Sequence, residues 1–261
     1  TYYENVVIDK PLTLQGEDRD ATIIDGGDSL DVVLITSDWV NVTGFTLFDG
    51  GDGTRECGVE LYYVANCLLE DLVCTDSTYG IFINRSDNNT VENNTVYGTR
   101  HGIRVGSSSE NTIRDNTIHD NTGSGIHIQT DSFNNTLSNN TIYNHSSTTY
   151  AGIDVLSNQT IIVSNNIYNN YYGIRLYTSN NTIYNNYFNN TNNAYDTGNN
   201  TWNISKTSGR NIVNGCYLGG NYWSDYFGSD SDSDGLGDTP YSIPGGSNQD
   251  NHPLMLRVYN V

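Results

Sequence analysis

Lysine is almost absent from this chain of 261 residues, which contains only Lys10 and Lys206. Lysine and arginine together number 11 against 30 aspartates and glutamates, and the formal net charge is −19. A surface this acidic argues against nucleic acid and anionic lipid as partners. No hydrophobic run approaches the length of a membrane span, and no secretory signal peptide is recognisable. The function classes that remain are those of an acidic protein without a membrane span.

Cysteine is scarce as well, with four residues at Cys57, Cys67, Cys74 and Cys216. Their spacing lacks the close chelating pair of a zinc site, so we expect no zinc. Four cysteines allow three pairings, among which a sequence does not choose. Free or internally bridged cysteines are one interpretation. Disulfides between neighbouring subunits in an oxidising exterior are the other.

What is abundant is a repeated phrase: a glycine, two alternating apolar residues, a turn, and then Asn-Thr-aliphatic. The steps between successive phrases are 21 to 27 residues, and the glycines that open them are Gly58, Gly80, Gly102, Gly125, Gly152 and Gly173. A period of this size with strand-like alternation predicts one solenoid coil per repeat.

Aligning the repeats places apolar residues in four columns, which begin at Val59, Leu61, Leu68 and Val73. Aliphatic residues, mostly β-branched, at period 2 predict strands with these side chains turned inward. The Asn, Gly, Thr and Ser content between them excludes helix. The columns are therefore expected to form the core.

A polar column runs through the same repeats, two residues before the fourth apolar column: Asp71, Asn94, Asn116, Asn140, Asn165 and Asn186. Amides stacked on successive coils satisfy one another by hydrogen bonding, so this column predicts a structural ladder inside the solenoid. A polar binding track is the alternative.

Two less regular segments, 5–25 and 31–57, read as two further coils. The sequence therefore predicts an all-β, single-domain, right-handed parallel β-helix of about eight coils over residues 1–195. Residues 196–261 are expected to form a C-terminal cap.

The Asn-x-Thr-Ile phrase and the opening TYYENVVIDKPLTLQGEDRDATIIDG resemble NosD-like, parallel β-helix repeat proteins of archaeal and bacterial cell surfaces. The ending GGNYWSDYFGSDSDSDGLGDTPYSIP is similar to that of archaeal, often methanogen, members. The resemblance implies a cell-surface β-helix in a superfamily that mixes polysaccharide lyases and hydrolases with proteins of no known chemistry. It also implies a capping segment before Thr1, so we expect a processed chain or a fragment.

Besides the resemblance to cell-surface proteins, possible glycosylation sites also favour an extracellular location. The chain contains twelve Asn-x-Ser/Thr triplets, which are acceptor sites for N-glycosylation. An Asn- and Thr-rich repeat also generates such triplets by composition alone.

The strand after each repeat glycine carries one outward residue, and the column reads Glu60, Phe82, Arg104, His127, Asp154 and Arg175. If the protein is an enzyme, this Arg-His-Asp-Arg stripe is its candidate catalytic site. In a lyase, Arg104 or Arg175 would neutralise a uronate carboxylate and His127 would take the α-proton. A solvated stripe of mixed charges is the alternative. We expect no carboxylate pair on adjacent coils, which disfavours a glycoside hydrolase.

The tail contains a calcium-type loop. Its expected Ca²⁺ ligands are the carboxylates of Asp230, Asp232, Asp234 and Asp238 and the Leu236 carbonyl. Because the twelfth position is Tyr241 and not glutamate, the loop is not an EF-hand. A flexible acidic loop is the alternative.

Unpaired strands begin within five residues of Thr1, whereas the C-terminal end has material to cover it. Together with 20 tyrosines, this predicts a non-catalytic extracellular protein that self-assembles, head to tail and laterally, into an envelope, sheath or filament. The alternative is a surface protein that binds or cleaves polysaccharide through the charged stripe.

Overall fold

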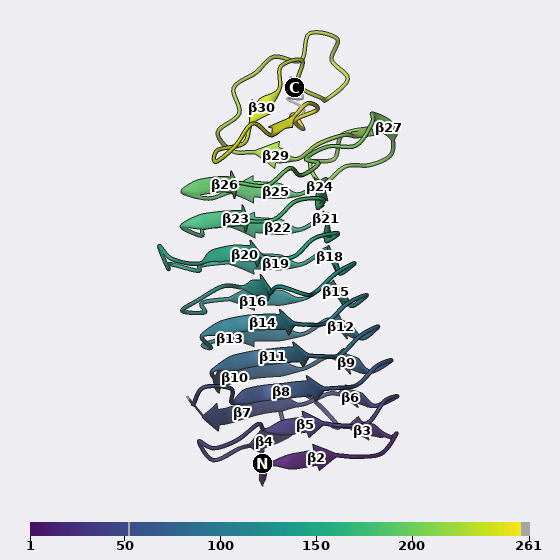
Figure 1. Cartoon of the computed structure of the whole chain (residues 1–261), viewed down its shortest axis with the longest axis vertical. Helices are drawn as coiled ribbons and strands as arrows, with labels where there is room; N and C mark the ends of the chain where they lie inside the picture. Colours follow the sequence, from purple (N-terminus) through teal and green to yellow (C-terminus); the bar gives the residue numbers. More distant parts are fainter. Residues whose placement is uncertain (52, 257–261) are drawn as a thin grey trace.

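The computed structural model describes residues 1–51 and 53–256 of the chain. It is a right-handed parallel β-helix of about eight complete coils, with the N-terminus at one end and the C-terminal tail folded over the other (Figure 1). The predicted fold class is therefore confirmed. Within the described residues, no helix is long or apolar enough to cross a membrane.

Three parallel sheets form the walls, and every full coil contributes one strand to each. Sheet A contains β1 (Tyr2–Tyr3), β4 (Ile23–Asp25), β7 (Thr46–Gly51), β10 (Val73–Ser77), β13 (Thr95–Tyr97), β16 (Thr117–His119), β19 (Thr141–Tyr143), β22 (Asn166–Tyr168), β25 (Tyr187–Asn189) and β29 (Tyr222–Trp223). Sheet B contains β2 (Val6–Ile8), β5 (Val33–Ile35), β8 (Cys57–Tyr62), β11 (Tyr79–Asn84), β14 (His101–Gly106), β17 (Ile126–Ile128), β20 (Ala151–Val155), β23 (Tyr172–Leu176) and β26 (Asn192–Asp196). Sheet C contains β3 (Thr13–Gln15), β6 (Asn41–Thr43), β9 (Leu68–Glu70), β12 (Thr90–Glu92), β15 (Thr112–Arg114), β18 (Thr136–Ser138), β21 (Ile161–Val163) and β24 (Thr182–Tyr184).

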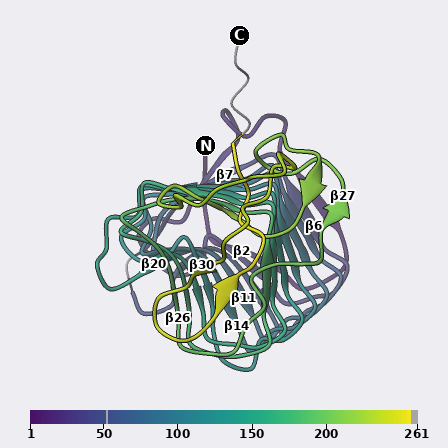
Figure 2. The ribbon, with the colours of Figure 1, turned by 90° about the horizontal axis from the view of Figure 1, so that it is seen from above.

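The core is a set of aliphatic columns enclosed by the three sheets, whose ribbon is seen end-on in Figure 2. The two columns predicted from Val59 and Leu61 are present, and both residues are fully buried. The other two predictions were wrong by one residue in a single coil. Leu69, not Leu68, pairs with Val91, and Cys74, not Val73, pairs with Val96.

The repeat glycines allow neighbouring coils to approach closely. A Cβ atom added to Gly102 would lie 2.6 Å from the Gly125 carbonyl oxygen and 2.5 Å from the Ile118 side chain. Any side chain there would push two coils apart, which explains why the repeat opens with glycine.

The buried asparagines form a ladder in which the side-chain oxygen of one coil accepts hydrogen bonds from the asparagine of the coil before. Asn94 donates to Asn116 through its backbone N–H and its side chain, both at 3.0 Å. The ladder continues through Asn116, Asn140, Asn165, Asn186 and Asn221.

Asp71 was assigned wrongly to this ladder. It is exposed, with φ at 53°, and the residue in register with Asn94 is Leu72, whose backbone N–H donates to Asn94 Oδ1 at 2.9 Å. The ladder therefore begins at a leucine, which has no side-chain amide to reveal it. Asn221 was missed because the tail separates it from Asn186 by 35 residues.

The regular coils extend past the predicted boundary at residue 195. Strand β26 runs to Asp196, Thr201 forms a parallel bridge to Thr182, and β29 adds the last strand of sheet A. Two short antiparallel pairs then fold over the end: β27 (Thr207–Ser208) with β28 (Tyr217–Leu218), and β30 (Tyr241–Ser242) with β31 (Gln249–Asp250).

All four cysteines are free thiols, so the structure shows none of the predicted disulfides within the chain. Cys57, Cys67 and Cys74 are buried, and Cys216 is exposed. Burial raises the pKa of all three buried thiols, to about 12 for Cys74. They therefore act as small apolar side chains, and only Cys216 is available to another chain.

Candidate functional site

The outward column of sheet B is continuous from one end of the solenoid to the other. Its pairing register gives Val7, Leu34, Glu60, Phe82, Arg104, His127, Asp154, Arg175 and Tyr195 in order. The four residues of the predicted stripe thus lie on the adjacent strands β14, β17, β20 and β23. Successive members are separated by one coil, or about 4.8 Å.

Arg104 is held in place by aromatic and polar neighbours. Its guanidinium carbon lies 4.5 Å from the centre of the Tyr79 ring and 5.3 Å from that of Phe82. Its Nε donates to Gln129 Oε1 at 3.1 Å, and its Nη1 donates to the Tyr79 hydroxyl. A guanidinium fixed in this way can hold an anion with little further ordering.

Next to Arg104, His127 packs against a second histidine. The ring centres of His127 and His101 are 5.1 Å apart with the planes tilted by 53°, and the Tyr150 ring lies edge-to-face with His101 at 5.0 Å between ring centres. His101 Nδ1 accepts a hydrogen bond from the Ser124 backbone N–H, which leaves the ring proton on Nε2. His127 Nδ1, by contrast, is buried without a hydrogen-bond partner within the protein.

Both imidazoles are neutral at neutral pH. Burial is the main cause that lowers the pKa of His127 to about 4, and Arg104 and Arg175 lower it further. Burial, with the charge of His127, lowers the pKa of His101 to about 3. A neutral His127 keeps one ring nitrogen as an acceptor, and because Nδ1 is buried, only Nε2 can meet a ligand on the face.

Asp154 differs from the other residues of the stripe because both oxygens of its carboxylate already accept hydrogen bonds. It is 1% exposed and receives both Nε and Nη2 of Arg175 at 2.7 Å. Its other oxygen accepts from the Ser124 hydroxyl at 2.7 Å and from the Ala151 N–H at 2.9 Å. Asp154 therefore positions Arg175 and is not a free base.

Positive charge gathers on this face despite the net charge of −19. Arg55, Arg104 and Arg175 contact residues of the column, and Arg100 donates to the Tyr150 hydroxyl beside it at 3.4 Å. Tyr172 and Tyr177 flank the Arg175 guanidinium, with ring centres at 5.3 and 5.5 Å. Arginines next to aromatic rings suit a ligand that has both anionic groups and apolar ring faces.

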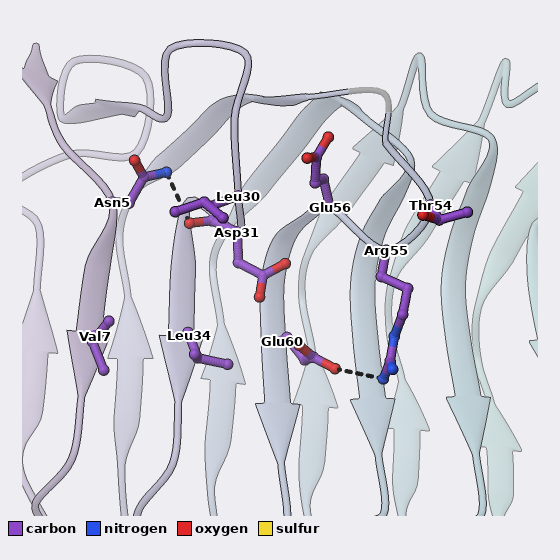
Figure 3. A pocket seen from close by; sticks show the side chains of 9 residues that line it. All are labelled: Asn5, Val7, Leu30, Asp31, Leu34, Thr54, Arg55, Glu56 and Glu60. Carbon is purple, nitrogen blue, oxygen red and sulfur yellow. Dashed lines mark hydrogen bonds and ion pairs between the residues drawn. The ribbon is translucent and has the colours of Figure 1, made fainter.

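The N-terminal end of the same face is different, because it holds an acidic pair that the sequence analysis predicted to be absent. Asp31, in the turn before β5, and Glu60, on β8, come from adjacent coils and point into one pocket (Figure 3). Each carboxyl group influences the pKa of the other. Asp31 was missed because it lies outside the regular repeats.

A column of stacked rings on sheet A does not offer flat ring faces. Tyr97, His119, Tyr143 and Tyr168 stack face to face on successive coils, with ring centres 4.9 to 5.2 Å apart. Their faces are covered by one another, so the stack exposes ring edges and hydroxyls to solvent. Cross-strand packing accounts for this column.

In the tail, ligand oxygens of Asp230, Asp232 and Asp234 lie within 4.8 Å of one another. Lys206 Nζ forms an ion pair with Asp234. The Asp238 carboxylate instead accepts the Ser231 backbone N–H at 2.7 Å, and the Leu236 side chain is buried among Val213 and Leu254. The structure thus gathers three of the four carboxylates expected as calcium ligands.

Sequence reasoning placed Arg104, His127, Asp154 and Arg175 on one face but missed Tyr79 and His101. These two occupy the position directly before the repeat glycine, where they pair with each other in register. The signal was present, because three of the six repeats carry a ring at that position, the third being Tyr172 before Gly173. Listing that column would have found them.

Comparison with known proteins gives one family match. Residues 22–228 match the family model described as periplasmic copper-binding protein (NosD). Among curated proteins, none matches the sequence significantly.

Solved structures share the fold at low sequence identity. An alginate lyase from Paenibacillus sp. str. FPU-7 has 16% identity and a TM-score of 0.57, with 76% of this chain and 84% of that chain covered. The A-module of the Azotobacter vinelandii mannuronan C-5 epimerase AlgE6 has 15% identity and a TM-score of 0.52, covering 74% and 68%. The A-module of AlgE4 from the same organism has 16% identity and a TM-score of 0.54, covering 70% and 62%.

Proposed function

The chain belongs to the NosD family, and we propose that it binds an acidic polysaccharide along the outward face of sheet B and acts on its uronate residues. The observation that carries the proposal is the neutral, half-buried His127 between the two fixed arginines Arg104 and Arg175. The solved structures with this fold include an alginate lyase and two mannuronan epimerases, which act on uronate polymers.

The chemistry follows from the charges on the face. Arg104 or Arg175 pairs with the uronate carboxylate and stabilises the negative charge that develops when the α-carbon loses its proton. The neutral imidazole of His127 takes that proton. If the glycosidic C–O bond then breaks and the leaving oxygen takes a proton from the imidazolium, the product is an unsaturated sugar and a free chain end. If instead water delivers a proton to the α-carbon from the opposite face, the sugar is epimerised.

Asp154 supports this chemistry indirectly. Because its two oxygens are occupied by Arg175, Ser124 and Ala151, it fixes the Arg175 guanidinium relative to His127. We assign it as a positioning residue.

The family description mentions copper, but the donor set does not fit that metal. Copper prefers imidazole, thiolate and thioether ligands. In the part of the chain that the structure describes, the only group of three or more His, Cys, Asp or Glu ligand atoms is Asp230, Asp232 and Asp234. His101 and His127 form a pair without a third ligand of these types. Three carboxylates suit a hard cation, so we propose Ca²⁺ for the tail loop.

We further propose that the protein works outside the cytoplasm, as the description of its family states for NosD. Polysaccharides of cell surfaces would be available to it there. The earlier prediction of self-assembly gains no support from these observations, whereas the alternative of a polysaccharide-acting surface protein does.

The test is incubation of the purified protein with alginate and with polygalacturonate. Ultraviolet absorbance of the unsaturated product detects cleavage, and proton NMR detects epimerisation. The triple variant R104A/H127A/R175A should lose binding and turnover while its circular dichroism spectrum is unchanged. The control R114A removes an equally charged side chain from sheet C, where Arg114 pairs with Glu92. If the triple variant and R114A behave alike, the proposal is wrong.

A further inference from the structure

A pocket of about 350 Å³ lies at the N-terminal end of the sheet B face, between β2, β5, β8 and the turn before β8 (Figure 3). One wall is apolar, because the side chains of Val7, Leu30 and Leu34 line it. Val7 and Leu30 are 61% and 66% exposed, so this apolar surface is open to solvent. The other wall carries the carboxyl groups of Asp31 and Glu60. A concave apolar surface with a few convergent polar groups is typical of small-ligand sites.

The two carboxyl groups share a restricted environment. Glu60 is 7% exposed, accepts from Asn84 Nδ2 at 2.7 Å, and lies 3.6 Å from Arg55 Nη2. Burial and the neighbouring Asp31 raise the pKa of Glu60 to about 7, and burial also raises the pKa of Asp31. At neutral pH this wall of the pocket therefore carries negative charge, which suits hydroxyl groups and disfavours a further carboxylate.

Asp31 and Glu60 line this wall beside the apolar one. The pocket therefore suits a ligand that has both hydroxyl groups and an apolar face.

We propose that this pocket binds an uncharged, hydroxylated sugar residue of the same polysaccharide whose uronate lies between Arg104 and Arg175. The inference rests on the proposed function and narrows it: the substrate is a heteropolymer of neutral and acidic sugars, and a polymer of uronates alone is a poor ligand. Its neutral unit lies against Val7, Leu30 and Leu34 and donates hydroxyl hydrogens to the carboxyl pair.

The spacing of the face allows one polymer chain to reach both places. Glu60 and His127 belong to the same outward column and are three coil steps apart, or roughly 14 Å. A chain lying parallel to the solenoid axis spans a few sugar residues over that distance. One end of the face therefore selects an uncharged sugar and the other end an acidic sugar of the same ligand.

The experiment compares two polymers by titration calorimetry. Alginate carries a carboxylate on every sugar, whereas hyaluronan alternates glucuronate with an uncharged amino sugar. The wild-type protein should bind hyaluronan at least about tenfold more tightly per repeat than alginate, because like charges side by side cost several kcal/mol. D31N/E60Q should bind alginate about tenfold more tightly than the wild type does. E110Q, which removes an exposed carboxylate from a turn, is the control and should change neither affinity.

The outcomes separate the two proposals. Equal affinity of the wild type for both polymers, or no gain for alginate in D31N/E60Q, overturns the neutral-sugar pocket. If R104A then still abolishes binding of both polymers, the proposed function stands alone. If the wild type binds neither polymer, both proposals fall. The single variant E60Q, which keeps Asp31 in contact with the Cys57 N–H, replaces the double variant if the latter does not fold.

Discussion

At the scale of single residues, the site is defined by which polar atoms already have partners. Asp154 is saturated by Arg175, Ser124 and Ala151, whereas His127 Nδ1 has no partner within the protein. Residue types in a column do not reveal this difference, because it depends on neighbours from three coils. The sequence could therefore place both residues on one face but could not assign them different roles.

His127 should give the pH profile of kcat/KM an acid limb near pH 4, because its pKa in the free protein is about 4. The imidazole accepts a proton only when neutral, so activity should be full above this pH and fall below it. H127Q should lower turnover by about 10²–10⁴-fold, the range for loss of a general base, with binding largely kept.

R114A again serves as the control for that profile. A limb near pH 6.5, the ordinary value for histidine, or a limb at pH 4 that survives in H127Q, would show that another group is the base.

At the scale of the strand and coil, the repeat encodes the fold through two adjacent positions. The first, as at Asn139, has a left-handed backbone with φ at 56° and is exposed at the turn. The second, as at Asn140, is fully buried in the ladder. Asparagine suits both positions, since it tolerates positive φ and also donates and accepts hydrogen bonds.

Asn140→Ala should lower the free energy of unfolding by about 3 kcal/mol. Asn140 Oδ1 accepts from the Asn116 N–H and Nδ2, and its own Nδ2 donates to the Ile113 carbonyl at 2.9 Å. Alanine would leave these groups buried and without partners. Urea unfolding monitored by circular dichroism measures the change.

The matched control is the neighbouring variant Asn139→Gly, which keeps a residue suited to positive φ at an exposed position. It should change the free energy of unfolding by less than about 0.5 kcal/mol. Equal losses in both variants would contradict the ladder as a source of stability.

The columns could be predicted from the sequence wherever the repeat keeps its asparagine. The predicted columns were wrong by one residue in the coil that contains Leu69, Leu72 and Cys74. In that coil, leucine occupies the ladder position and cysteine the core position. The Asp31–Glu60 pair was lost for a related reason, since Asp31 belongs to a coil without the repeated phrase. Pattern alignment fails where a side chain is replaced by one that fills the same space with different chemistry.

At the scale of the whole molecule, the tail decides how the solenoid ends. If its acidic loop binds Ca²⁺, millimolar calcium should raise the melting temperature of the tail by a few degrees, because ligand at 100 times its Kd adds about 2.7 kcal/mol. D232N should abolish the shift, while D238N should keep it, since the Asp238 carboxylate is bound to the Ser231 N–H. Differential scanning calorimetry with calcium and with chelator measures this.

The ion pair between Lys206 and Asp234 provides a check on the same site. Its ammonium group competes with a metal ion for the carboxylate, so K206A should strengthen calcium binding. An unchanged melting temperature in calcium for both the wild type and K206A would rule out the site.

Asp250 joins the tail to the solenoid, because it ends the asparagine ladder. Its fully buried carboxylate accepts the Asn221 N–H at 2.7 Å, the Trp223 indole N–H at 2.9 Å and the His252 N–H at 3.0 Å. Burial raises its pKa from 3.8 to about 6 in spite of these donors. Between pH 3.8 and about 6, therefore, this carboxyl group is protonated in the folded protein and ionised in the unfolded chain.

The sign of the pH dependence follows. A carboxyl group with a raised pKa contributes stability that is full below about pH 4 and is lost as the pH rises to about 6. The loss is on the order of 2–3 kcal/mol for a shift of this size. Glu60, with its pKa raised to about 7, extends the decline in stability to neutral pH.

Urea unfolding from pH 4 to 7.5 should thus show a free energy of unfolding that falls with pH. D250N should remove the part of the decline below about pH 6, and E60Q should remove the part near pH 7. Stability that rises across this range in the wild type, or a decline unchanged in both variants, would show that the buried carboxyl groups are ionised without penalty.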